Sequence, residues 1–273
     1  MGVGVYALLF LCSWHYFAFF VALVAMIGQD EYQRMACPHA GRGKRLFLGV
    51  LTMILALSPL VTMLNIPSGL YPILIIAMWA IVFLAIAGLH LSKPLPLEKS
   101  ASRVGLDLLG VVYLGATLPG VLGLRMIDIE SGWAWVLLSM LITFGGDTGG
   151  YFMGRMIGGK IFGERRLAPQ LSPKKTWEGF IGCLLLGTGG AFLASSQFQP
   201  CGILSATDCI ILGVVGVTLG VLGDLFESLM KRSAGAKDSG TLIPGHGGVL
   251  DRIDSLLFVS PMLYIYLMIR LAN

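Results

Sequence analysis

Long apolar runs separated by short polar segments dominate this 273-residue chain. A run of about 20 apolar residues is long enough to cross a bilayer as a helix. Eight such runs lie near residues 5–28, 46–64, 70–91, 104–124, 133–153, 179–198, 206–223 and 255–271. The pattern therefore predicts an all-α, polytopic integral membrane protein with about eight transmembrane helices.

The composition agrees with this class. The chain is 56% hydrophobic and 12% charged, with a mean hydropathy of +0.82, which is typical of a membrane protein rather than of one with a soluble core. The first run has no charged residue before it, so we interpret it as a plain span and not as a cleavable signal peptide. The cysteines show no CxxC pairing and favour small buried side chains over zinc or disulfides. They are Cys12, Cys37, Cys183, Cys201 and Cys209.

Basic residues alternate between the segments that separate the runs. Segments 29–45, 92–103, 154–178 and 224–254 hold four, three, six and four of them, whereas the intervening segments hold one or none. Seventeen of the 19 Lys and Arg residues thus fall on one side, which is the cytoplasmic side by the positive-inside rule. We predict a multi-pass protein of the cell inner (cytoplasmic) membrane, with its active site facing the cytoplasm.

We find no internal repeat, and we predict a single membrane domain over residues 1–273. Residues 1–140 form a mostly hydrophobic scaffold, and residues 141–260 carry the chemistry. Asp107, a lone acid in the scaffold, is more typical of a helix cap or a local partner than of a site residue. The glycine-rich runs of the second half predict closely packed helices.

Acidic residues lie at, or just inside, the cytoplasmic ends of three apolar runs. They are Asp147, Asp224, Asp251 and Asp254. Ionisable groups at a membrane boundary are costly and usually functional. Carboxylates from separate helices repel one another unless a cation lies between them, and hard oxygen ligands suit Mg²⁺. We predict a Mg²⁺ site at Asp147, Asp224 and Asp251, with Asp254 as a further or supporting ligand. The alternative is that Asp224 and Asp251 only pair with Lys231 and Arg252.

The spacing around Asp224 is helical. Asp224, Glu227, Ser228 and Lys231 follow at i, i+3, i+4 and i+7, which places them on one face of a helix. A polar stripe on an apolar helix should face a water-filled cavity or other polar groups.

Two basic, glycine-containing segments are candidates for binding phosphate. Segment 172–179 (SPKKTWEG) holds Lys174, Lys175 and Thr176, and segment 237–249 reads KDSGTLIPGHGGV. Backbone N–H groups in such turns bind phosphate oxygens, and Lys adds charge. A lipid head group, a nucleotide or an anionic membrane surface would fit equally well. His246 is either a phosphate donor or acid–base group, or a structural histidine.

The polar stretch 228–255 resembles the signature of the phosphatidate cytidylyltransferase (CDP-diacylglycerol synthase) family. The matching runs are Ser228-x-x-Lys231-Arg232, Lys237-Asp238-Ser239-Gly240, Pro244-Gly245-His246-Gly247-Gly248 and Asp251-Arg252-x-Asp254-Ser255. The run Asp147-x-Gly149-x-Tyr151 and segment 172–179 are also similar to that family. The resemblance covers about residues 140–260 and reaches the first half only through hydropathy.

The resemblance implies a Mg²⁺-dependent membrane nucleotidyltransferase that joins CTP and phosphatidic acid for phospholipid synthesis, giving CDP-diacylglycerol and pyrophosphate. It implies a homodimer and a membrane lipid partner, and we expect no nucleic-acid partner. The catalytic residues that we expect are Asp224, Asp251, Asp254 and His246. The expected substrate-binding residues are Lys174, Lys175, Thr176, Ser228, Lys231, Arg232, Lys237, Asp238, Gly247, Gly248 and Arg252.

The chain departs from the family at its start. Relatives generally begin with a basic N-terminus and an additional hydrophobic segment, whereas this chain begins almost within an apolar run.

Three other functions could account for a polytopic chain with these acids. An ion-coupled transporter would not need two cytoplasmic Lys/Gly segments. A CDP-alcohol phosphotransferase would need a DGxxAR motif, which is absent. A cytidylyltransferase acting on a polyprenol or phytol phosphate would differ only in its lipid groove.

Overall fold

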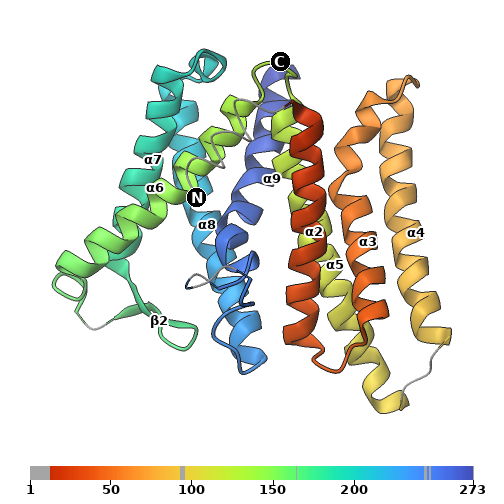
Figure 1. The fold of residues 1–273 in the computed structure, drawn as a ribbon. Helices are drawn as coiled ribbons and strands as arrows, with labels where there is room; N and C mark the ends of the chain where they lie inside the picture. The colour runs from red at the N-terminus through yellow and green to blue at the C-terminus, as the bar shows by residue number, and fades with distance from the viewer. Residues whose placement is uncertain (1–12, 93–95, 164, 243–244, 246, 273) are drawn as a thin grey trace. The chain divides into compact units, whose positions relative to one another are not determined.

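The computed structural model describes residues 13–92, 96–163, 165–242, 245 and 247–272. Most of these residues are helical, and Figure 1 shows the main helices in chain order. The main helices are α2 (Trp14–Ala36), α3 (Arg42–Ala56), α4 (Tyr71–Ser92), α5 (Leu97–Met126), α6 (Trp133–Ile157), α7 (Trp177–Gln197), α8 (Ala206–Ser233) and α9 (Leu250–Ala272). Short 3₁₀ helices are η2 (Ser58–Met63), η3 (Ser68–Leu70) and η4 (Gln199–Ile203).

Each of the eight apolar runs overlaps one of these helices. In the described part of the chain, α4, α5, α7, α8 and α9 are long and apolar enough to cross a membrane. The chain is therefore a multi-pass membrane protein. Helix α3 has 15 residues, about 22 Å of helix, which is less than a bilayer core of about 30 Å. That α2, α3 and α6 also cross the membrane remains a prediction from the sequence.

The first compact unit comprises Met1–Gly123 together with Asp238–Leu250. Its apolar core joins α3, α4 and α5 through Leu48, Leu51, Leu55, Val82, Ile86 and Val111. The Tyr32 hydroxyl on α2 donates to the Leu106 carbonyl on α5 at 3.0 Å, which links these two helices. On α4, large side chains such as Ile73 and Ile76 stay exposed. An exposed apolar face of this kind suits contact with acyl chains.

The second compact unit comprises Leu124–Lys237 together with Asp251–Asn273. Helices α6 and α7 approach closely at Gly149 and Gly182. A Cβ atom added at either glycine would meet the backbone carbonyl oxygen of the other. Small residues allow membrane helices to pack in this way. The predicted close packing of the glycine-rich runs is therefore confirmed for this helix pair.

The described chain is mainly helical, which agrees with the predicted all-α class, and a short β-hairpin lies between α6 and α7. Strands β1 (Arg166–Ala168) and β2 (Ser172–Thr176) pair antiparallel, with Arg166 opposite Thr176 and Ala168 opposite Ser172. Pro169 and Pro173 lie in this segment. Because proline lacks an N–H group and disfavours helix in the residue before it, the segment between α6 and α7 cannot continue either helix.

Candidate active site

The polar end of α8 presents one face, as its spacing predicts. The Ser228 hydroxyl donates to Asp224 Oδ1 at 3.4 Å, and Lys231 Nζ donates to Glu227 Oε2 at 2.8 Å. Both contacts join residues four apart, which stack on the same side of a helix. The predicted polar stripe is therefore confirmed.

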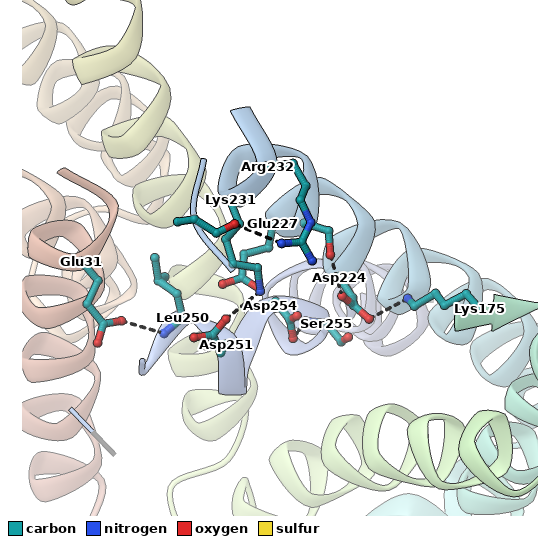
Figure 2. A network of polar contacts seen from close by, with 12 residues as sticks. Glu31, Lys175, Asp224, Glu227, Lys231, Arg232, Leu250, Asp251, Asp254 and Ser255 are labelled. Carbon is teal, nitrogen blue, oxygen red and sulfur yellow. Dashed lines mark hydrogen bonds and ion pairs between the residues drawn. The ribbon is translucent and has the colours of Figure 1, made fainter. Parts of the chain in front are cut away.

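Lys231 joins this stripe to α9. Its ammonium also donates to Asp251 Oδ1 at 2.6 Å, as Figure 2 shows. The Glu227 side chain is 1% exposed, and the side chains of Lys231 and Asp251 are 11% and 8% exposed. One buried ammonium balances only one of the two negative charges that two ionised carboxylates carry. The alternative pairing of Asp251 with Lys231 is thus observed.

Asp224 pairs with a different cation from the one considered in the alternative. Lys175, on β2, places its Nζ 2.6 Å from Asp224 Oδ2, and both side chains are partly exposed. The extended backbone of β2 directs Lys175 toward α8, and α7 begins two residues later, at Trp177. Thr176 is the N-cap of α7, where its hydroxyl accepts from the Gly179 N–H at 3.0 Å. Thr176 therefore has a structural role beside any role in substrate binding.

A cavity of about 220 Å³ opens where these elements meet. Five predicted site residues line it: Asp147, Lys174, Lys175, Thr176 and Asp224. Gly150, Gly154 and Gly179 keep part of its wall free of side chains. The second unit therefore gathers one acid from α6, one acid from α8 and two lysines from the hairpin around a single space.

The remaining acidic residues interact electrostatically with the residues that line the cavity. Asp147 interacts through charge with Asp224, Lys175 and Arg252, and Asp254 interacts with Asp224 and Asp147. Glu227 interacts with Asp254 and Asp251. We call Asp147, Asp224, Glu227, Asp251 and Asp254, with Lys175, Lys231 and Arg252, the charged cluster. Its acids outnumber its cations, so a further cation would stabilise it.

The chemistry of the cluster fits a hard divalent cation, although its side chains do not surround one. The possible ligands are carboxylate oxygens, which Mg²⁺ prefers. Glu227 Oε1 is buried and has no hydrogen-bond partner among the described residues. In the same residues, no group of three His, Cys, Asp or Glu side chains is arranged to hold a metal ion. Bringing three oxygens onto one ion would require these side chains to turn.

Several predicted residues lie outside the cavity lining. Arg232 is exposed, and its guanidinium donates to the Ala236 carbonyl at 3.1 Å, just beyond the C-terminus of α8. Lys237 is exposed at the end of the second unit. Asp238, Gly247 and Gly248 belong to the first unit. His246 lies outside the described residues.

Glu31, on α2, was missed in the sequence analysis. Its Oε1 accepts from the Val249 N–H at 3.0 Å. Its Oε2 accepts from the Leu250 N–H, also at 3.0 Å, and Figure 2 shows this second bond. It thus caps the N-terminus of α9 and holds the end of the glycine-containing segment. A Cβ atom at Gly248 would clash with Ser239 Oγ and lie 2.6 Å from Glu31 Oε2, so a larger residue there would displace the carboxylate from its backbone donors. The sequence did offer one indication of this role, because Glu31 is an acidic residue that lies just after an apolar run.

Glu178 is a second anchor that the sequence analysis did not single out. Its buried carboxylate accepts from the N–H groups of Ile161 at 3.1 Å and Phe162 at 3.0 Å. These bonds tie the segment after α6 to the start of α7. Because α6 carries Asp147 and the hairpin carries Lys175, Glu178 stabilises the loop between the two elements that supply the cavity.

The fold and the site define a multi-pass membrane protein with a carboxylate-rich, lysine-lined cavity. The model of the cytidylyltransferase family matches residues 1–270. The chain therefore belongs to the cytidylyltransferase family, which confirms the resemblance first seen in residues 228–255.

Individual relatives carry a more specific name. The phosphatidate cytidylyltransferase of Haemophilus influenzae is 46% identical over 148 residues, which are 52% of this chain and 50% of that protein. Those of Synechocystis sp. and Pseudomonas aeruginosa are 33% and 29% identical over 97% and 93% of this chain, and over 92% and 88% of their own lengths. The chain thus spans about half the length of the Haemophilus relative and most of the other two.

Proposed function

We propose that this chain transfers the cytidylyl group of CTP to phosphatidic acid, giving CDP-diacylglycerol and pyrophosphate. The observation that supports this most directly is the cavity of the second unit, where Asp147, Asp224 and Lys175 meet. Lysines would bind the anionic groups, and the acids would bind a cation that both reactants need. The chain's membership of the cytidylyltransferase family supports the nucleotide chemistry.

The reaction requires little covalent help from the protein. An oxygen of the lipid phosphate attacks the α-phosphorus of CTP, and a new O–P bond forms. The bond from the α-phosphorus to the pyrophosphate oxygen breaks, and pyrophosphate leaves with the electron pair. A phosphate monoester has its second pKa at about 6, so the nucleophile is largely ionised at neutral pH. A strong general base is therefore unnecessary.

The main obstacle is repulsion between two anions. Lys174 and Lys175 line the cavity and would hold phosphate oxygens during the approach. Positioning and electrostatic stabilisation dominate phosphoryl-type transfers. A cavity of about 220 Å³ is smaller than the roughly 300–1,000 Å³ of sites that enclose whole ligands. We therefore assign it to the phosphate part of the nucleotide.

Mg²⁺ is the cofactor of this proposal. We assign Asp147, Asp224 and Asp251 as its ligands, with Asp254 in support, because their oxygens and their excess negative charge suit it. When bound, the ion would neutralise charge on the triphosphate. Asp251 is held by Lys231 at 2.6 Å, so its assignment requires this pair to open.

In this proposal, the remaining predicted site residues either bind phosphate groups or position the residues that hold the ion. Ser228 positions Asp224, and Lys231 positions Asp251. Lys237 and Asp238 join the two units along the chain, and the backbone at Gly247 and Gly248 would cradle a phosphate group. Arg232, Arg252 and His246 complete the proposed binding set.

The setting of the enzyme is also proposed. The alternation of basic segments supports an inner-membrane protein with eight spans and a cytoplasmic active site. Family resemblance supports a homodimer. Chemical cross-linking of the purified protein at several dilutions would test the dimer, and a monomer at every dilution would contradict it.

Incubation of the purified protein with labelled CTP, Mg²⁺ and phosphatidic acid tests the function. We expect a labelled liponucleotide and one equivalent of pyrophosphate. Asp224→Asn should reduce the rate by about 100-fold or more, because it removes an electrostatic contact to the reacting groups. Asp128→Asn, an exposed acid between α5 and α6, is the matched control and should retain the normal rate.

Two results would contradict this assignment. Near-normal turnover of Asp224→Asn at ordinary Mg²⁺ concentrations would remove Asp224 from the reaction. Transfer to a polyprenyl phosphate but not to phosphatidic acid would keep the nucleotide chemistry and replace the lipid substrate.

A further inference from the structure

The first unit contains a cavity of about 810 Å³, formed by the segment between α2 and α3, the end of α4 and the start of α5. Cys37, Lys44, His90, Lys99 and Arg103 supply most of its polar lining. The proposed reaction uses none of these residues, and the cavity lies in the range of roughly 300–1,000 Å³ typical of ligand sites.

Asp107 fixes two of the basic lining residues from behind. This fully buried acid accepts from Lys44 Nζ at 2.5 Å and lies 2.7 Å from His90 Nε2, both through Oδ2. The Gln33 amide donates to its Oδ1 at 3.0 Å. The partners of Asp107 therefore lie on α2, α3 and α4 and not within its own helix. A buried carboxylate with this many donors holds Lys44 and His90 in place at the cavity wall.

The cavity keeps positive charge beyond what Asp107 balances. Within the described residues, no carboxylate forms an ion pair with Lys99 or Arg103. Cys37 lines the same cavity as these two residues. Burial and the nearby Asp107 raise the pKa of the Cys37 thiol, while the charges of Lys44 and Arg103 act in the opposite direction. Arg103 and Cys37 both line the cavity, so a group bound at Arg103 would lie in the space that the thiol faces.

Apolar side chains line another part of the cavity wall. Phe47, Leu89 and Leu106 belong to this lining. Leu89 lies near the end of α4 and Leu106 on α5, and both helices are long and apolar enough to cross a membrane. A space with cations and apolar groups at the end of spanning helices matches a charged head group with the first carbons of its chains.

We propose that this cavity binds the phosphate head group of an anionic phospholipid. Arg103, Lys99 and Lys44 contact the phosphate oxygens, and Phe47, Leu89 and Leu106 contact the glycerol and the nearest acyl carbons. The shared chemistry is a phosphate oxyanion, which free phosphate could also supply. The site is independent of the proposed reaction, because it is assigned from residues of the first unit alone.

Alkylation of Cys37 measures occupancy directly. The full-length protein is placed in nanodiscs of phosphatidylcholine alone, or of phosphatidylcholine with phosphatidylglycerol, and treated with a small maleimide. Peptide mass spectrometry then gives the rate at each cysteine. We expect phosphatidylglycerol to slow the alkylation of Cys37. Cys183 lines the cavity of the second unit, so its rate should stay unchanged.

In Arg103→Gln, about tenfold more phosphatidylglycerol should be needed to give the same protection of Cys37. This is the effect on affinity of losing one charged hydrogen bond. Lys99→Gln, at an exposed position, provides a second variant if Arg103→Gln does not fold. Arg42→Gln is the matched control, since Arg42 is exposed on α3 and does not line the cavity. Full protection in Arg42→Gln supports the site.

Three results would overturn the proposal. Equal Cys37 rates in the two kinds of nanodisc would mean that no anionic lipid enters. Equal protection by inorganic phosphate in phosphatidylcholine nanodiscs would assign the site to a free anion. Undiminished protection in both Arg103→Gln and Lys99→Gln would show that the lipid acts through membrane charge elsewhere.

Discussion

At the scale of single residues, buried acids are matched to particular donors, and Glu31 is the clearest case. Both of its oxygens accept backbone N–H groups, at Val249 and Leu250. Gly240 also has no room for a side chain there, since a Cβ atom would lie 2.7 Å from Glu31 Oε1. Glu31 is therefore a positioning residue for the segment that carries Gly247 and Gly248.

Glu31→Gln should lower kcat/KM for CTP by about tenfold. An amide can accept only one of the two N–H groups and turns its own NH₂ toward the other, and an unsatisfied buried donor costs about 1–3 kcal/mol. Hydrogen exchange at Val249 and Leu250 should accelerate, and Tm should fall by a few degrees. Asp30→Asn is the control, because Asp30 binds Arg34 and Arg45. Unchanged exchange at both amides would contradict the positioning role.

Lys231 is predicted to stabilise the fold as well as the site. Lys231→Met would leave Glu227 and Asp251 buried without their shared cation and should lower the free energy of unfolding by about 3–5 kcal/mol. Thermal unfolding in detergent, followed by tryptophan fluorescence, measures this. Adding Glu227→Gln and Asp251→Asn should recover most of the Tm without recovering activity. A single variant with the Tm of the parent protein would contradict a structural ion pair.

The residues that the sequence could predict share one property. Asp224, Ser228 and Lys231 were predictable because their spacing on one helix fixes their relation. Lys231 was named among the possible partners of Asp251, but Lys175 was not foreseen as the partner of Asp224, because it reaches Asp224 from another element and spacing along the chain does not give such distances. Glu31 was missed for the same reason, since its partners are more than 200 residues away.

At the scale of elements, the apolar runs located the helices and some of their starts, but not all of their ends. Helix α5 begins at Leu97, before the run that starts near residue 104, because Glu98, Lys99 and Arg103 extend the helix beyond its apolar part. Helix α8 begins with its apolar run, after Ser205, where a capping box with Asp208 fixes the start, but it continues to Ser233, beyond the end of the run near residue 223. The hairpin was missed because strands of three and five residues give no periodic signal beside long apolar runs.

Contact between α6 and α7 should depend on glycine at defined positions. Gly182→Ala adds a methyl group where the Gly149 carbonyl lies, and should reduce the free energy of unfolding by about 1–3 kcal/mol. It should also reduce activity, because α6 carries Asp147. Gly189→Ala on the same helix is the control, since no atom lies within 4 Å of the added Cβ. An equal Tm for the two variants would contradict the close approach.

At the scale of the whole molecule, the number of membrane crossings decides where the charged segments lie. Helices α4 and α5 are long and apolar enough to span, and α6 was predicted to span but carries Asp147 and Arg155. Ser68 precedes α4, and Lys160 follows α6. Three crossings between these exposed residues would put them on opposite sides of the membrane, and two crossings would put them on the same side.

Single-cysteine variants distinguish these two arrangements. Ser68→Cys and Lys160→Cys, each in a chain without its native cysteines, are exposed to a membrane-impermeant maleimide in intact cells and after permeabilisation. We expect Ser68→Cys to label in intact cells and Lys160→Cys only after permeabilisation. Equal labelling of both would mean that α6 does not cross. Basic segments 92–103 and 154–178 would then face opposite sides, and Lys174 and Lys175 would lose the shared cytoplasmic position that the proposed reaction with CTP requires.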